Sequence, residues 1–177
     1  MAIASSTLSD LTDPELIWLG AMMMYVGETA QGFALWHRVA ASTQSPLRDM
    51  ARGNIGEQLI RLTNDVDAAR PLLEAAVGEF KKGDALSGPR AVAAASLGHV
   101  RAAAGQLASA NELWAAAIAS GDRPAVAMAQ VYQARQALAE GRVPLASSLL
   151  KQAMMDSPAE VRSDAEGLLA SLPPVAE

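Results

Sequence analysis

An internal repeat constrains the fold of this 177-residue chain more than any other feature of its sequence. One copy runs Gly98, Gly105, Ala110, Trp114 and Ala117, alternating small residues with one large apolar residue at fixed spacing. Three further copies read Gly20, Gly27, Gly32, Trp36, Val39; Glu57, Asn64, Ala69, Leu73, Ala76; and Ala134, Gly141, Ala146, Leu150, Ala153. Self-similarity at a spacing of some 36 to 41 residues predicts stacked copies of one supersecondary unit.

The spacing within each copy predicts a pair of helices joined by a tight turn. A small residue such as Gly98 lets a second helix approach closely, and the Gly or Asn seven residues later tolerates the positive φ of a helix end. Ala110 and Trp114 lie one turn apart on the second helix, so Trp114 is expected to fill the seam between the two helices. The expected seam residues are Trp36, Leu73, Trp114 and Leu150.

These residues resemble the tetratricopeptide repeat (TPR) family, whose pattern includes a Leu-Gly pair, then A-x₃-F, then Pro. Leu97 and Gly98 match the pair, Ala110 and Trp114 match the second step loosely, and Pro158 matches the closing Pro. The resemblance implies an all-α fold: a right-handed α-solenoid of about four TPR-like helical hairpins plus a C-terminal capping helix. The repeat is longer than the family's 34 residues, and one copy has Glu57 where a small residue is expected.

Turn residues and N-cap signals divide the chain into one domain at 13–172, with tails expected to be flexible at 1–12 and 173–177. The expected hairpins are about 13–44, 45–82, 89–122 and 123–157, followed by the capping helix at 158–172. Asp13, Ser45 and Ser157 each precede a Pro and are expected to be N-caps, and Ser157 with Glu160 forms a capping-box pattern.

Composition argues against several classes of function. The net charge of −5 and the lack of a basic cluster speak against nucleic-acid binding, and the absence of cysteine excludes disulfides and thiol catalysis. The longest nearly uncharged stretch, residues 16–26, is too short to span a bilayer, so no membrane insertion is expected. A cytoplasmic location is expected, or a periplasmic one if a natural leader precedes this sequence. His37 and His99 have no companion ligands at metal spacing, so no metal, cofactor or catalytic residue is predicted.

The first expected helix is apolar nearly all the way round. An end helix of a solenoid has one neighbour fewer than an internal helix, so this pattern predicts a further contact. The residues expected to mediate self-association are Ile17, Trp18, Ala21, Met24 and Tyr25. Burial under the N-terminal tail is the alternative.

The TPR resemblance also implies a concave groove lined by the first helix of each hairpin. The polar residues that the repeat register directs into it are Asn54, Gln58, Arg61, His99 and Arg135. Arg61 and Arg135 predict a preference for an acidic polypeptide, and His99 at its ordinary pKa would strengthen binding on acidification. A merely solvated groove is the alternative.

The predicted function is therefore a scaffold or adaptor that binds another polypeptide in its groove, rather than an enzyme. One alternative is a chaperone of the type III secretion kind, which would dimerise through its N-terminal helices. A second alternative is an enzyme or small-molecule sensor built on a helical array.

Overall fold

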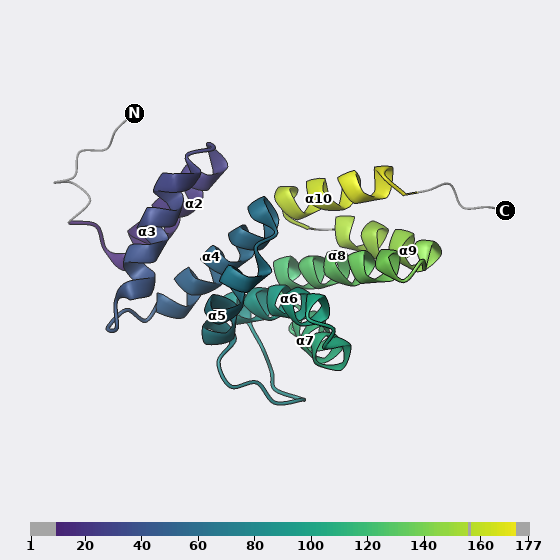
Figure 1. Ribbon diagram of the computed structural model, residues 1–177. Helices are drawn as coiled ribbons and strands as arrows, with labels where there is room; N and C mark the ends of the chain where they lie inside the picture. Colours follow the sequence, from purple (N-terminus) through teal and green to yellow (C-terminus); the bar gives the residue numbers. More distant parts are fainter. Residues whose placement is uncertain (1–9, 156, 173–177) are drawn as a thin grey trace.

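The computed structural model describes residues 10–155 and 157–172, and over these ranges the protein is all-helical, with nine helices and no strands (Figure 1). The helices are α2 (Asp13–Tyr25), α3 (Thr29–Ala41), α4 (Arg48–Thr63), α5 (Val66–Val77), α6 (Gly88–Ala103), α7 (Leu107–Ala119), α8 (Arg123–Ala139), α9 (Val143–Met154) and α10 (Ala159–Ala170). Each expected hairpin thus contains two helices.

Consecutive helices pack in pairs: α2 on α3, α4 on α5, α6 on α7, and α8 on α9. The first helices of neighbouring pairs also pack together, since α4 contacts α6, α6 contacts α8, and α10 contacts both α8 and α9. One continuous apolar core runs from α4 to α10 and is built largely from alanine, which permits this close packing.

The two tryptophan copies of the repeat have the same geometry. The Trp36 indole donates a hydrogen bond to the Ile17 carbonyl at 3.0 Å, and Trp114 donates to the Ala95 carbonyl at 3.1 Å, each across 19 residues of chain. A Cβ atom at Gly98 would lie 2.4 Å from the Trp114 indole nitrogen, and a Cβ at Gly20 would lie 2.3 Å from that of Trp36. Glycine is therefore required where the indole crosses the first helix. All four expected seam residues are buried, which confirms that prediction.

The predicted helix ends are also confirmed. Asn64 has φ 53° and is the one described non-glycine residue with positive φ, while Gly105 has φ 76°. Gly27 and Gly141 have positive φ at the equivalent positions.

Four local predictions were wrong. In the second copy the small residue under the seam is Gly56, against which Leu73 packs, so Glu57 is turned toward the other face of α4. The first helix is capped by Thr12, which forms a capping box with Glu15, rather than by Asp13. The helix α10 begins after Pro158 without a side-chain cap, so Ser157 is not its N-cap. Ser45 likewise precedes α4 at a distance, because that helix begins at Arg48.

The α2–α3 pair is set apart from the rest of the stack (Figure 1). The helix α2 does not pack on α4 in the way that α4 packs on α6 and α6 packs on α8. The link to α4 is provided by α3. A small apolar cluster of Leu16, Leu35 and Val39 from this pair includes Ala51 of α4, so it joins the pair to the rest of the molecule.

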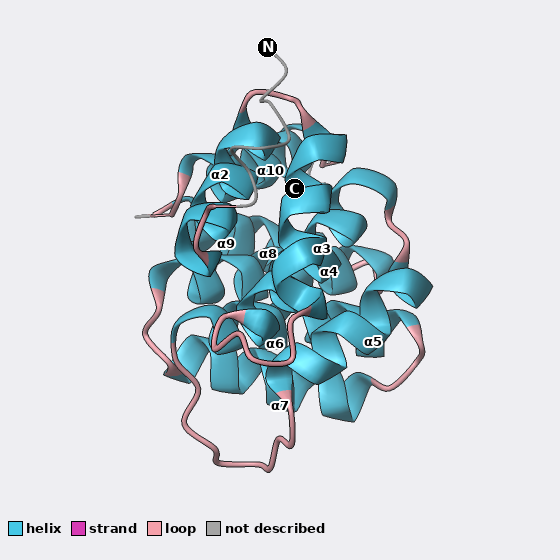
Figure 2. Ribbon diagram, turned by 90° about the vertical axis from the view of Figure 1, so that its left-hand side faces the viewer, coloured by secondary structure: helices cyan, strands magenta, loops and turns pink. Residues whose placement is uncertain are grey.

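The longest connection, residues 78–87, projects from one side of the molecule as an extended loop (Figure 2). Arg90 anchors its start, because the guanidinium donates to the carbonyls of Val77 and Glu79, both at 2.7 Å.

Candidate binding surfaces

The helices α4, α6, α8 and α10 bring a set of charged and aromatic side chains together. Arg61, near the end of α4, lies 3.0 Å from the Glu160 carboxylate and 3.3 Å from that of Asp164, both on α10. Glu57, one turn earlier on α4, is 3.8 Å from the same guanidinium. Three carboxylates therefore share one cation.

Burial disfavours the ionised form of Glu57 in this cluster. Its side chain is only 16% exposed, and burial raises its pKa to about 7. The Arg61 guanidinium lowers that pKa, while Glu160 and Asp164 raise it further. Glu57 therefore titrates close to neutral pH, whereas Glu160 and Asp164 lie at the more exposed edge.

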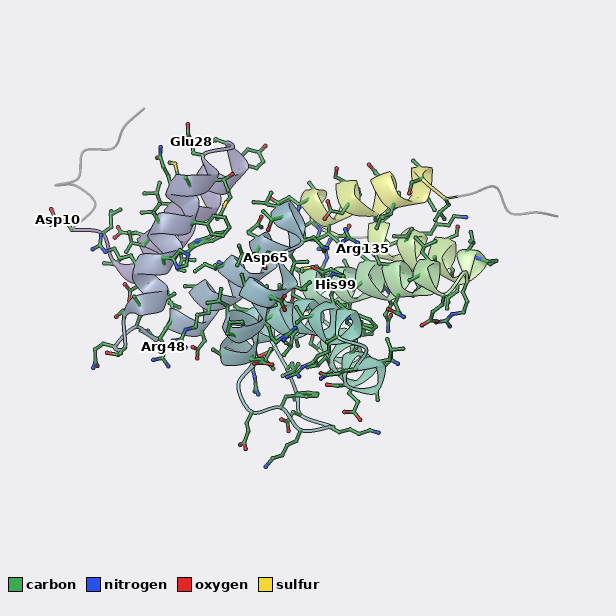
Figure 3. All side chains as sticks on the ribbon, viewed as in Figure 1. Asp10, Glu28, Arg48, Asp65, His99 and Arg135 are labelled. Atoms are coloured by element: carbon green, nitrogen blue, oxygen red, sulfur yellow. The ribbon has the colours of Figure 1, made fainter. Side chains whose placement is uncertain are left out.

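A second group is built on α6 and α8. The His99 ring stacks on the Tyr132 ring with centroids 4.7 Å apart, and the Arg135 guanidinium lies 5.8 Å from the centre of the Tyr132 ring. Figure 3 labels His99 and Arg135. Burial and the Arg135 charge lower the pKa of His99 to about 4. The Nε2 atom of His99 and the Nε atom of Arg135 are both buried without a hydrogen-bond partner.

The structure thus places three of the five expected groove residues, Arg61, His99 and Arg135, around one surface, but they differ in ion pairing and in pKa. Arg135 has no carboxylate partner among the described residues, whereas Arg61 is already paired with α10. The prediction that His99 titrates near pH 6.5 is wrong, because burial next to a cation keeps it neutral. Asn54 and Gln58 lie half-buried on α4.

Sequence reasoning missed Glu57, Tyr132, Glu160 and Asp164. The spacing of four residues between Glu160 and Asp164 on one helix was a readable signal for a shared partner. The partner itself lies about a hundred residues away, so no local pattern could indicate it.

The outer face of α2 is the second candidate surface. Trp18 is 65% exposed and Tyr25 is 78% exposed, and Ala21 and Met22 are exposed between them. These four residues follow one stripe of the helix, which we call the α2 stripe. Ile17 and Met24, expected in the same surface, are half-buried and turned toward α3, where Met24 packs beside Gly32.

A hollow of about 740 Å³ lies between the 78–87 loop and α7. Its walls are mostly the methyl groups of Ala115, Ala116 and Ala119, with Leu86 from the loop, and Lys82 with Glu112 at one edge. It was not anticipated from the sequence, and Asp84, Asn111 and Ser120 also contribute to its lining.

No known family model, characterised protein or solved structure matches the chain. Over the described ranges, no three acidic or histidine side chains are grouped to hold a metal ion. None of the helices described is long and apolar enough to cross a membrane.

Proposed function

We propose that the protein is a scaffold that binds an acidic polypeptide segment on the surface formed by α4, α6 and α8. In this proposal the helix pairs form four TPR-like hairpins of a right-handed solenoid, with α10 as the capping helix. The repeated Gly–Trp packing, the positive φ at each hairpin turn and the contacts between first helices all support that arrangement.

The observation that carries the proposal is the state of Arg135. Its side chain is partly exposed, no described carboxylate lies within ion-pair distance, and its Nε donor is buried without an acceptor. A partly buried cation without a carboxylate partner costs free energy, and an acidic ligand would offset that cost through charge-assisted hydrogen bonds to the exposed part of the guanidinium. The guanidinium lies over the Tyr132 ring, which itself stacks on His99, and this packing preorganises it for such a ligand.

The test combines capture and titration. Partners captured from the native host with the wild-type protein are identified by mass spectrometry, and the binding of each purified partner is then titrated. Arg135→Ala is expected to weaken binding about 10- to 100-fold, as for the loss of a hydrogen bond to a charged group. Arg70→Ala, which removes the same charge from the outer helix α5, serves as the matched control. If Arg135→Ala binds like the wild type, the groove is not the site.

A second candidate function, self-association through the α2 stripe, is favoured by its exposure. Trp18 and Tyr25 together offer roughly 300 Å² of aromatic surface, against the roughly 800 Å² per partner of a stable interface. The stripe carries no charge, so a second copy can pack on it without burying an unpaired ion. Light scattering should show a dimer that Trp18→Ser with Tyr25→Ser converts to monomer. A monomer at high micromolar concentration of the wild-type protein would contradict this candidate.

A further inference from the structure

Ion pairs of Arg61 with Glu160 and Asp164 link α4 to α10 beside the surface formed by α4, α6 and α8. Glu160 and Asp164 are spaced four residues apart, so both carboxylates lie on one face of α10 and reach Arg61 together. Each is followed by a small apolar residue, Val161 and Ala165, and these two are the buried residues of α10. The helix thus presents an acidic residue and an apolar residue, repeated after one turn.

Beyond these contacts, α10 is attached through the half-buried Leu168 and Leu169, which pack against the core. The helix buries two of its twelve residues, whereas α6 and α8 each bury eight. Its N-terminus has no side-chain cap, and Gly167 in its exposed part lowers helix propensity. An end helix with few buried side chains opens at a lower free energy than the helices of the core.

Electrostatics also weaken this contact. Arg61 offers a single positive charge to Glu57, Glu160 and Asp164. When Glu57 is ionised it repels both α10 carboxylates and competes for the guanidinium. The other charged or titratable groups around this surface are Tyr132 and Arg135 of α8 and His99 of α6, and none of them is a carboxylate that could substitute for α10.

We propose that α10 is a displaceable internal ligand of the groove, and that the partner is a helical segment that repeats its pattern. Such a segment carries two carboxylates one turn apart, each followed by a small apolar residue. It displaces α10 from Arg61 and from the apolar contacts of Val161 and Ala165, and then extends toward Arg135. This inference rests on the proposed function, because it specifies the partner of the same surface.

The first test uses a fluorescein-labelled peptide of residues 157–172 as the probe. In fluorescence anisotropy titrations, the wild-type chain is expected to bind it weakly, because its own α10 occupies the site. The full chain with Glu160→Gln and Asp164→Asn releases Arg61, so it is expected to bind the peptide at least about 10-fold more tightly. Adding Arg61→Ala to that variant should remove the gain. A peptide with both carboxylates neutralised is the matched probe, and equal binding of the two peptides would overturn the proposal.

Hydrogen exchange provides a second measurement that needs no added ligand. Arg61→Ala is expected to speed the exchange of α10 amides about 10-fold while those of α6 and α8 keep the wild-type rate. Arg70→Ala should change neither. If α10 exchanges only together with α6 and α8, it does not open separately and the proposal fails. That failure would leave the Arg135→Ala effect on a captured partner intact, so the two proposals can fail independently.

Discussion

Glu57→Gln should stabilise the protein at neutral and alkaline pH and leave it almost unchanged at pH 4.5. The folded state raises the pKa of Glu57 from 4.5 to about 7, so it holds the proton more tightly than the unfolded chain does. The stability that this provides is fully present below about pH 4.5 and is lost as the pH rises through 7. A difference of this size between the folded-state and unfolded-state pKa corresponds to about 3 kcal/mol in the free energy of unfolding. Glutamine keeps the shape of the protonated carboxyl and cannot ionise.

The wild-type pH profile alone would not reveal this effect. His99 has its pKa lowered to about 4, so its contribution is present above its ordinary pKa of about 6.5 and is lost as the pH falls through 4. The contributions of Glu57 and His99 therefore change in opposite directions over the same pH range. Comparing the variant with the wild type isolates Glu57.

The assay is urea unfolding followed by circular dichroism at pH 4.5, 6 and 8. The free energy of unfolding of Glu57→Gln should exceed that of the wild type by a margin that grows from near zero at pH 4.5 to about 3 kcal/mol at pH 8. Glu166→Gln, on the exposed face of α10, is the control and should show no such growth. A margin that is the same at pH 4.5 and pH 8 would refute the reasoning.

Three further substitutions test the packing. Gly98→Ala should cost about 1–3 kcal/mol in urea unfolding, because the added methyl would overlap the Trp114 indole; Gly53→Ala, which has room for a methyl, should be neutral or stabilising. Trp114→Ala should cost about 3–5 kcal/mol, and a smaller loss would show that the seam is not tightly packed. Arg90→Ala should increase proteolysis within residues 78–87, since it removes both bonds that anchor the loop; unchanged cleavage would show that the loop is held by other contacts.

The helices and their turns could be predicted because their determinants are local. The first helix of each pair ends at a residue with positive φ, and Gly or Asn at a fixed spacing signals it directly. The Gly–Trp seam could be predicted for a similar reason, since both partners belong to one repeat and recur in another copy. The copy with Glu57 shows the limit, because Gly56 and Glu57 are adjacent and one residue of register decides which of them meets Leu73.

The charged cluster could not be predicted, because it depends on distances between separate repeats. The sequence assigned Arg61 and Arg135 the same role as free cations in a groove. Their states differ because α10 passes beside Arg61 and supplies two carboxylates there, while no described carboxylate reaches Arg135. The pKa of His99 differs from its expected value for a related reason, since burial in the packed interior and the charge of Arg135, which comes from another helix, both lower it.

The difference between the two arginines connects the fold to the proposed function. Arg135 is partly buried and no described carboxylate pairs with it, and in the proposed function an acidic partner supplies that pairing. Arg61 shows what such a partner would look like, since α10 already satisfies it with two acidic residues one turn apart. A partner with this arrangement can pair with Arg61 only if it displaces α10, whereas Arg135 has no described carboxylate partner that it would have to displace. We therefore expect the protein to favour acidic partners that contact Arg61 and Arg135 together. A partner that contacts only one of them leaves the other arginine without the carboxylate that the partner would supply.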